Sequence, residues 1–186
     1  MNARMLVIAG MFGAGLGLAA PHAVAQNKFD SWYTIALAAS HNATDQVQSM
    51  LVQGGQDPDA VDSVSGRTAL DYAASFNNLA MAKILLDHGA GVDARDPSGN
   101  TALHWAAERG NIAVMKLLIA RKAMVDAADK QGITPLMQAI AHSQPRAVRL
   151  LIESGADPHK QDFTGRDAFG WARENPTMMQ ALEAKR

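Results

Sequence analysis

Histidines are the side chains in this chain best suited to acid–base or metal chemistry near neutral pH. They are His22, His41, His88, His104, His142 and His159. No His-x-x-x-His or His-Glu-x-x-His spacing occurs, so no helix is predicted to present two metal ligands on one face. The chain also has no cysteine, which excludes thiol catalysis and disulfides. We therefore expect no catalytic residue, no metal and no cofactor.

A haem or small-ligand site is the alternative that these residue types leave open. Haem iron needs an axial ligand in an apolar pocket, and His41, His88 or a methionine could supply one. No nucleophile elbow is present, and the glycine-rich stretch at 10–17 lies in an apolar N-terminal run rather than in a phosphate-binding loop. A ligand carrier thus stands as a minor hypothesis beside a purely interacting protein.

The elements that would position any site follow from a period in the glycines. Gly66, Gly99, Gly132 and Gly165 are spaced 33 residues apart, and each begins a related phrase. The clearest copy is Gly99-Asn100-Thr101-Ala102-Leu103-His104. A fixed period of this length indicates a stacked repeat protein. Such a stack usually acts by presenting a surface to a partner.

The phrase resembles the ankyrin repeat. Residues 96–107 carry its pattern Asp-x-x-Gly-x-Thr-Pro-Leu-His-x-Ala-Ala with Ala102 in place of the proline, and Gly110-Asn111 and Gly155-Ala156-Asp157 match its turn and its helix end. The resemblance implies an all-α repeat solenoid, an ankyrin stack of helix-turn-helix units with projecting β-hairpin loops. It predicts one ankyrin-repeat domain over 26–186. Its repeats are 31–65, 66–98, 99–131, 132–164 and 165–186, of which the first is a degenerate N-terminal cap without the Gly-x-Thr-x-Leu opening and the last a C-terminal cap.

The residue types within the phrase predict local structure. The first helices should be capped by side chains that accept a backbone N–H, namely Thr68, Thr101, Thr134 and Asp167. The second helices carry apolar stripes at helical spacing, as in 112–119. The resemblance further implies that His104 forms a hydrogen bond between repeats.

The ends of the second helices should adopt left-handed backbone. Gly89 and Gly155 stand where such a residue closes a helix. Lys122 takes that place in the middle repeat, so we expect slight strain there.

The N-terminal stretch reads as a secretory signal peptide over 1–25. Arg4 precedes an apolar run of about 16 residues, shorter than the roughly 20 that a spanning helix needs, and Ala23-Val24-Ala25 offers a cleavage site. A membrane anchor is the weaker alternative. We expect a periplasmic protein that begins at Gln26 and has no membrane contact after cleavage. The net charge is −1, or −2 without Arg4, so no basic field favours nucleic acid.

The binding face is predicted from where partners of the family usually lie, on the hairpin tips and the exposed side of the first helices. Carried onto this chain, the protein-binding residues are Arg67, Phe76, Arg95, Asn100, Trp105, Glu108, Arg109, Lys130, Ile133, His142, Phe163 and Arg166. Aromatic residues and arginines dominate binding energy at interfaces. We therefore expect the strongest contributions near the middle of the stack.

One position of the first helices leaves two interpretations open. Tyr72, Trp105 and Trp171 share it, and Gln138 takes it in the third full repeat. The rings could form an exposed row along the concave side, or they could pack between repeats.

The resemblance implies a protein–protein interaction module without enzymatic activity, a monomer whose partner is another protein. Small exported bacterial proteins of this family are associated with peroxide defence alongside a catalase, and with inhibition or neutralisation of a periplasmic hydrolase or toxin. Both roles are hypotheses at this point.

Overall fold

The computed structural model describes residues 34–53 and 56–183 and folds them into helix pairs. The first helices of the pairs are α1 (Ile35–Ser40), α3 (Ala69–Ser75), α5 (Ala102–Arg109), α7 (Pro135–Ala141) and α9 (Ala168–Ala172). The second helices are α2 (Thr44–Val52), α4 (Leu79–Asp87), α6 (Ile112–Ala120), α8 (Pro145–Glu153) and α10 (Pro176–Glu183). The predicted signal peptide at 1–25 lies outside the described residues.

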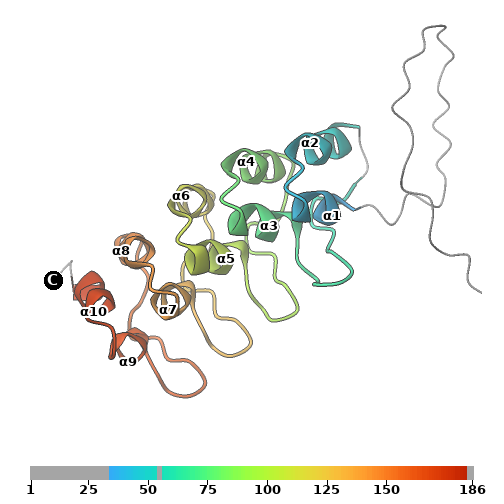
Figure 1. Cartoon of the computed structure of the whole chain (residues 1–186). Coiled ribbons are helices and arrows are strands. Elements are labelled where there is room, and N and C mark those ends of the chain that lie inside the picture. The colour runs from blue at the N-terminus through green and yellow to red at the C-terminus, as the bar shows by residue number, and fades with distance from the viewer. Residues whose placement is uncertain (1–33, 54–55, 184–186) are drawn as a thin grey trace, which may run out of the picture. The chain divides into compact units, whose positions relative to one another are not determined.

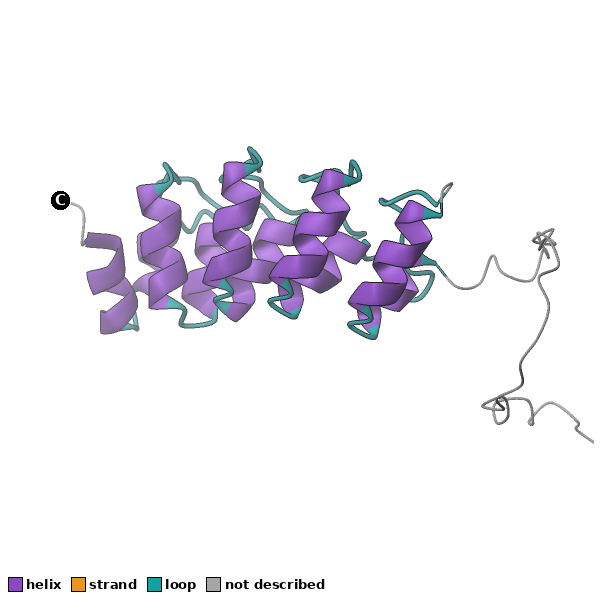
Figure 2. Ribbon diagram, turned by 90° about the horizontal axis from the view of Figure 1, so that it is seen from above, coloured by secondary structure: helices purple, strands orange, loops and turns teal. Residues whose placement is uncertain are grey.

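The helices form two rows. First helices pack against the first helices of neighbouring repeats, and second helices against second helices. In Figure 1 the long loops project from the row of first helices, and Figure 2 shows the second helices side by side. This is the all-α solenoid that the period predicts.

The first helices α1, α3, α7 and α9 begin at a side-chain cap, whereas the Thr101 hydroxyl at the start of α5 lies 3.0 Å from His104 Nδ1. The hydroxyls of Thr68 and Thr134 and the carboxylate of Asp167 accept N–H groups of the first turn. Thr34 does the same for α1, with 3.2 Å between its hydroxyl and the Leu37 nitrogen. The first repeat therefore keeps its cap although it lacks the Gly-x-Thr-x-Leu opening.

The core lies between the two rows. Paired alanines such as Ala73-Ala74 and Ala106-Ala107 are fully buried and let the helices approach closely. The second helices contribute larger side chains, among them the fully buried Leu118 and Leu151. The predicted apolar stripes are thus the inward faces of these helices.

The projecting loops differ from the expected β-hairpins. Within the described residues no strand forms, and the one isolated bridge joins Val61 to Thr68. A loop such as 96–100 is closed by two backbone hydrogen bonds, from the Asp96 N–H to the Asn100 carbonyl and from the Gly99 N–H to the Asp96 carbonyl, both at 2.9 Å. The Asp96 carboxylate accepts the Ser98 and Asn100 N–H groups, so the loop turns tightly instead of pairing as strands.

The closing residues of the second helices behave as predicted. Gly89 and Gly155 have φ of 90° and 93°. Lys122 has φ of 69°, a left-handed value that L-residues adopt at a cost. The expected strain in the middle repeat is therefore present.

Candidate protein-binding face

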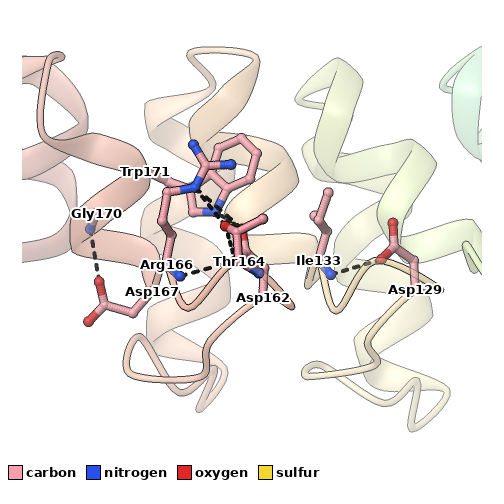
Figure 3. A network of polar contacts seen from close by, with 8 residues as sticks. All are labelled: Asp129, Ile133, Asp162, Thr164, Arg166, Asp167, Gly170 and Trp171. Atoms are coloured by element: carbon pink, nitrogen blue, oxygen red, sulfur yellow. Dashed lines mark hydrogen bonds and ion pairs between the residues drawn. The ribbon is translucent and has the colours of Figure 1, made fainter.

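The loops between repeats are built around one aspartate each. The carboxylate of Asp129 accepts the Gln131 and Ile133 N–H groups, both at 2.8 Å. Asp162 holds its own loop in the same way, and Figure 3 shows both. Burial opposes ionisation of Asp162, but hydrogen bonds from Thr164, the Arg166 N–H and Trp171 outweigh it and lower its pKa to about 2. Asp162 is therefore ionised and buried, and both carboxylates accept hydrogen bonds from their own loops.

Neighbouring loop tips are tied together through backbone groups. The Lys130 N–H donates to the Ser98 carbonyl at 3.0 Å, and the Phe163 N–H donates to the Gln131 carbonyl at 2.9 Å. Pro97 holds the equivalent place in the preceding loop and has no N–H to donate. The regular pattern of bonds therefore joins the last three loops but not the first.

Arg95 adds a side-chain tie between two tips. Its Nη1 donates to the Gly99 carbonyl at 2.8 Å and to the Ala128 carbonyl at 2.7 Å. Since one bond stays in its own loop and the other reaches the next, this arginine fixes adjacent tips relative to each other.

A ladder of rings and one guanidinium spans the first two full repeats. The Phe76 and Tyr72 rings stack with centroids 6.2 Å apart. The Arg67 guanidinium lies 4.5 Å from the Tyr72 centroid and 3.7 Å from that of Trp105 in the next repeat. Its Nη2 also donates to the Asp71 carbonyl at 3.2 Å and to the Ser75 hydroxyl. Phe76, Tyr72, Arg67 and Trp105 thus form a preorganised unit, called here the ring ladder.

A second arginine–ring pair closes the C-terminal end of the face. The Arg166 guanidinium lies 4.2 Å from the Trp171 centroid, and the indole Nε1 donates to the Asp162 carboxylate at 2.9 Å (Figure 3). In the first full repeat Tyr72 donates to Asp62 in the equivalent way, also at 2.9 Å. These rings are fixed by their loop aspartates.

The expected bond of His104 between repeats is present. The Thr101 N–H donates to Nδ1 at 3.1 Å, so Nε2 carries the proton and donates to the Ile133 carbonyl at 3.1 Å. Burial lowers the pKa of His104, which keeps the ring neutral. His104 therefore links two neighbouring repeats through a buried hydrogen bond.

Asp71 occupies the place of His104 one repeat earlier. One carboxyl oxygen accepts the Thr68 N–H and hydroxyl, both at 2.9 Å, while the other is buried and has no partner among the described residues. Burial raises the pKa of Asp71 to about 7, against the opposing effects of the Thr68 bonds and the Arg67 charge. A buried carboxyl group thus titrates near neutral pH inside the stack.

The predicted site residues divide into two groups. The exposed ones are Phe76, Arg95, Arg109, Lys130, His142, Phe163 and Arg166. The half-buried ones are Arg67, Asn100, Trp105, Glu108 and Ile133. Arg67 is the clearest departure from its expected place on a free tip, because two rings enclose its guanidinium.

Both interpretations of the position shared by Tyr72, Trp105 and Trp171, an exposed row of rings and packing between repeats, hold in part. Tyr72, Trp105 and Trp171 are partly exposed, and each also packs against the core. Gln138 at the same position donates to Glu108 at 3.4 Å. The rings therefore contribute to the surface and to repeat packing together.

Sequence reasoning missed the polar groups that hold the face. It included Asp96 in the repeat pattern but gave the loop aspartates no role, and it did not single out Asp71. The departure of Asp71 from the histidine of the phrase was the available indication.

The arrangement defines a helical repeat protein that exposes one continuous face of loops and first helices. The family model for ankyrin repeats, described as three copies, matches residues 8–96 and 88–162. The chain belongs to the ankyrin-repeat family. No curated protein matches it. Within 34–53 and 56–183 no helix has the length and apolar character needed to cross a membrane.

Proposed function

We propose that this chain is an exported module that binds a partner protein in the periplasm and has no catalytic role. Ankyrin repeats indicate a protein–protein interaction module. The observation that carries the location of binding is the ring ladder, which holds the exposed Phe76 ring on a rigid base. Rigid aromatic anchors lower the entropy lost on binding.

The tips supply the second part of the proposed interface. Phe163 is 80% exposed and Val64 92%, although apolar side chains are normally covered. The backbone bonds between tips keep the last three loops in register. Binding energy should therefore concentrate on this side of the stack, and protection or neutralisation of the bound partner is the role proposed for it.

The test is site-specific photo-cross-linking in cells that export the chain. A photoreactive residue at Phe76 or Phe163 should give an adduct with another protein, whereas the same residue at Lys83 or Lys116 should not. Mass spectrometry of the adduct then separates a catalase from a hydrolase or toxin.

Affinity measurements with the purified partner complete the test. The combined change Arg95→Ala, Arg109→Ala and Ile133→Ala should weaken binding by at least about thirtyfold, with the parent's circular dichroism retained. Cross-links and affinity losses confined to Lys83 and Lys116 would place the interface on the second helices and refute the proposal.

A further inference from the structure

The exposed charges of the binding side have one dominant sign. We call the surface made of the loop tips (62–67, 95–100, 128–133 and 161–166) and the exposed ends of the first helices (75–76, 108–109, 141–142 and 173–174) the front face. Among the described residues its exposed basic side chains are Arg95, Arg109, Lys130, Arg166 and Arg173, whereas Glu174 is its exposed acidic one. The side chain of Glu108 is 17% exposed and is engaged by Arg109 at 3.4 Å and by Gln138.

The loop aspartates are less exposed than these basic groups. Asp62, Asp96 and Asp162 are 6–8% exposed, and Asp129 is half-buried. The Asp96 carboxylate accepts the Ser98 and Asn100 N–H groups at 2.8 and 2.9 Å, and the Asp162 carboxylate forms an ion pair with Arg166 at 3.6 Å. These contacts leave the negative charges in place, but the charged atoms most exposed to a ligand on the front face belong to guanidinium and ammonium groups.

The other side of the stack has no such bias. The exposed basic side chains on the second helices are Lys83, Lys116, Arg146 and Arg149, and the exposed acidic ones are Asp45, Asp87, Glu153 and Glu183. The Asp87 carboxylate forms an ion pair with Arg121 at 2.6 Å. The excess of exposed basic groups is therefore a property of the front face alone within the described part of the chain.

Aromatic rings and basic groups both occur along this face. Phe76, at the end of α3, is 47% exposed, and Arg109 ends α5 in the next repeat with a side chain 61% exposed. Lys130 and Phe163 then stand on neighbouring tips, tied through the Phe163–Gln131 backbone bond. A ligand that spans the repeats meets the Phe76 ring first. It then meets the two cations, Arg109 and Lys130, and finally the Phe163 ring.

We propose that the front face recognises an extended acidic segment of the partner. An apolar side chain of that segment lies on Phe76 and the ring ladder. Its carboxylates pair with Lys130 and with the exposed guanidinium groups of Arg109 and Arg166, which also contact Glu108 and Asp162. An extended chain advances about 3.3 Å per residue, so one segment can cross several repeats. Complementary charge favours this partner and disfavours basic ones. The inference rests on the proposed function and specifies the chemistry of the ligand.

The test is selection from a random twelve-residue peptide library displayed on phage, against the folded chain. The expected winners carry several Asp or Glu residues around one aromatic or aliphatic residue. Winners that are basic or lack an apolar residue, or the absence of enrichment over an Arg109→Ala, Lys130→Ala double variant, would overturn the inference.

Fluorescence anisotropy of the strongest peptide then locates its site. Arg109→Ala with Lys130→Ala should lower affinity at least about tenfold in 50 mM NaCl. Lys83→Ala with Lys116→Ala, which removes the same charge from the second helices, should change it less than about twofold. Raising NaCl to 200 mM should weaken parent binding several-fold. Equal losses in both double variants would refute the assignment.

The outcomes separate this inference from the function on which it rests. If the partner is cross-linked at Phe76 through a neutral or basic segment, the proposed interaction module is supported and the acidic ligand is refuted. Absence of any cross-link from the front face removes both.

Discussion

At the scale of single residues, this stack places charged groups where their surroundings decide their state. Asp62 has a pKa lowered to about 2, first because the Ser65 hydroxyl donates to it. Asp71 has a pKa raised to about 7, first because burial disfavours its charge. Two aspartates in neighbouring repeats therefore have pKa values shifted in opposite directions, one by hydrogen-bond donors and the other by burial.

Stability should depend on the protonation of Asp71. Its folded-state pKa lies above the unfolded value, so its contribution is complete below pH 4 and is lost as pH rises through about 7. Between pH 5 and pH 8 the parent should lose roughly 2–3 kcal/mol from this group. Asp71→Asn keeps the acceptor for Thr68 and removes the titration. Urea unfolding of both proteins at the two pH values measures the difference.

Other groups near Asp71 do not give the same signature. The charges of Arg67 and Asp96 act on Asp71 in opposite directions. His104 makes the opposite contribution to the pH dependence, because its lowered pKa destabilises the fold at acid pH. Both variants share these groups. Identical pH dependence in parent and Asp71→Asn would show that Asp71 is ionised throughout.

Arg67 should behave as a packing residue. Arg67→Ala removes its contacts with Tyr72 and Trp105 and its bond to the Asp71 carbonyl, and we expect a loss of about 1–3 kcal/mol. Lys130→Ala, on an exposed tip, should change the free energy of unfolding by about 0.5 kcal/mol or less. If urea unfolding shows a larger loss for Lys130→Ala than for Arg67→Ala, the packing role of Arg67 in the ring ladder is contradicted.

At the scale of the helix pair, the two helices have different tasks. First helices are short, capped by side chains and packed through alanines, which keeps neighbouring repeats close. Second helices supply the larger buried groups. The front face is thus carried by elements whose positions depend on the second row.

Truncation of a buried leucine in the second row should test this division. Leu118→Ala or Leu151→Ala, each at a fully buried position, should cost roughly 2–5 kcal/mol. Lys116→Ala on the same helix as Leu118 is exposed and should cost about 0.5 kcal/mol or less. Denaturant midpoints give the comparison, and a larger effect for Lys116→Ala would mean that the helix faces are assigned wrongly.

At the scale of the whole molecule, the described residues form a stack in which each repeat contacts its neighbours. The stability of such a protein is close to a sum over repeats and their interfaces. Pro97 interrupts the regular backbone bonds between tips, so the first loop is held by side chains and by Pro97 packing over Gly66. The tips of the last three loops are therefore held most firmly relative to one another.

The proposed export predicts a shortened mature chain. The small residues Ala23 and Ala25 fit signal peptidase cleavage before Gln26. The intact mass of the protein recovered from a periplasmic fraction should lack residues 1–25. Full-length protein in the membrane fraction would instead support the anchor.

The sequence by itself determined the repeat fold, because a 33-residue period and its capping and apolar positions are local and recur in register. It predicted that Thr68 caps a helix, that Lys122 ends a helix in a strained conformation and that His104 forms a hydrogen bond between repeats. It also placed most of the front face, since tip and helix positions follow from the phrase. These features depend on residues a few positions away in the sequence, or on positions that recur in each repeat.

Only the tertiary structure decided which of those residues are available to a partner. Arg67 and Trp105 meet across a repeat boundary, and Arg95 reaches the carbonyl of Ala128 in the next tip. Burial and donors on both sides of an interface also separate the pKa of Asp71 from that of Asp62. Such effects depend on distances between side chains that only packing fixes, which residue type and spacing cannot supply.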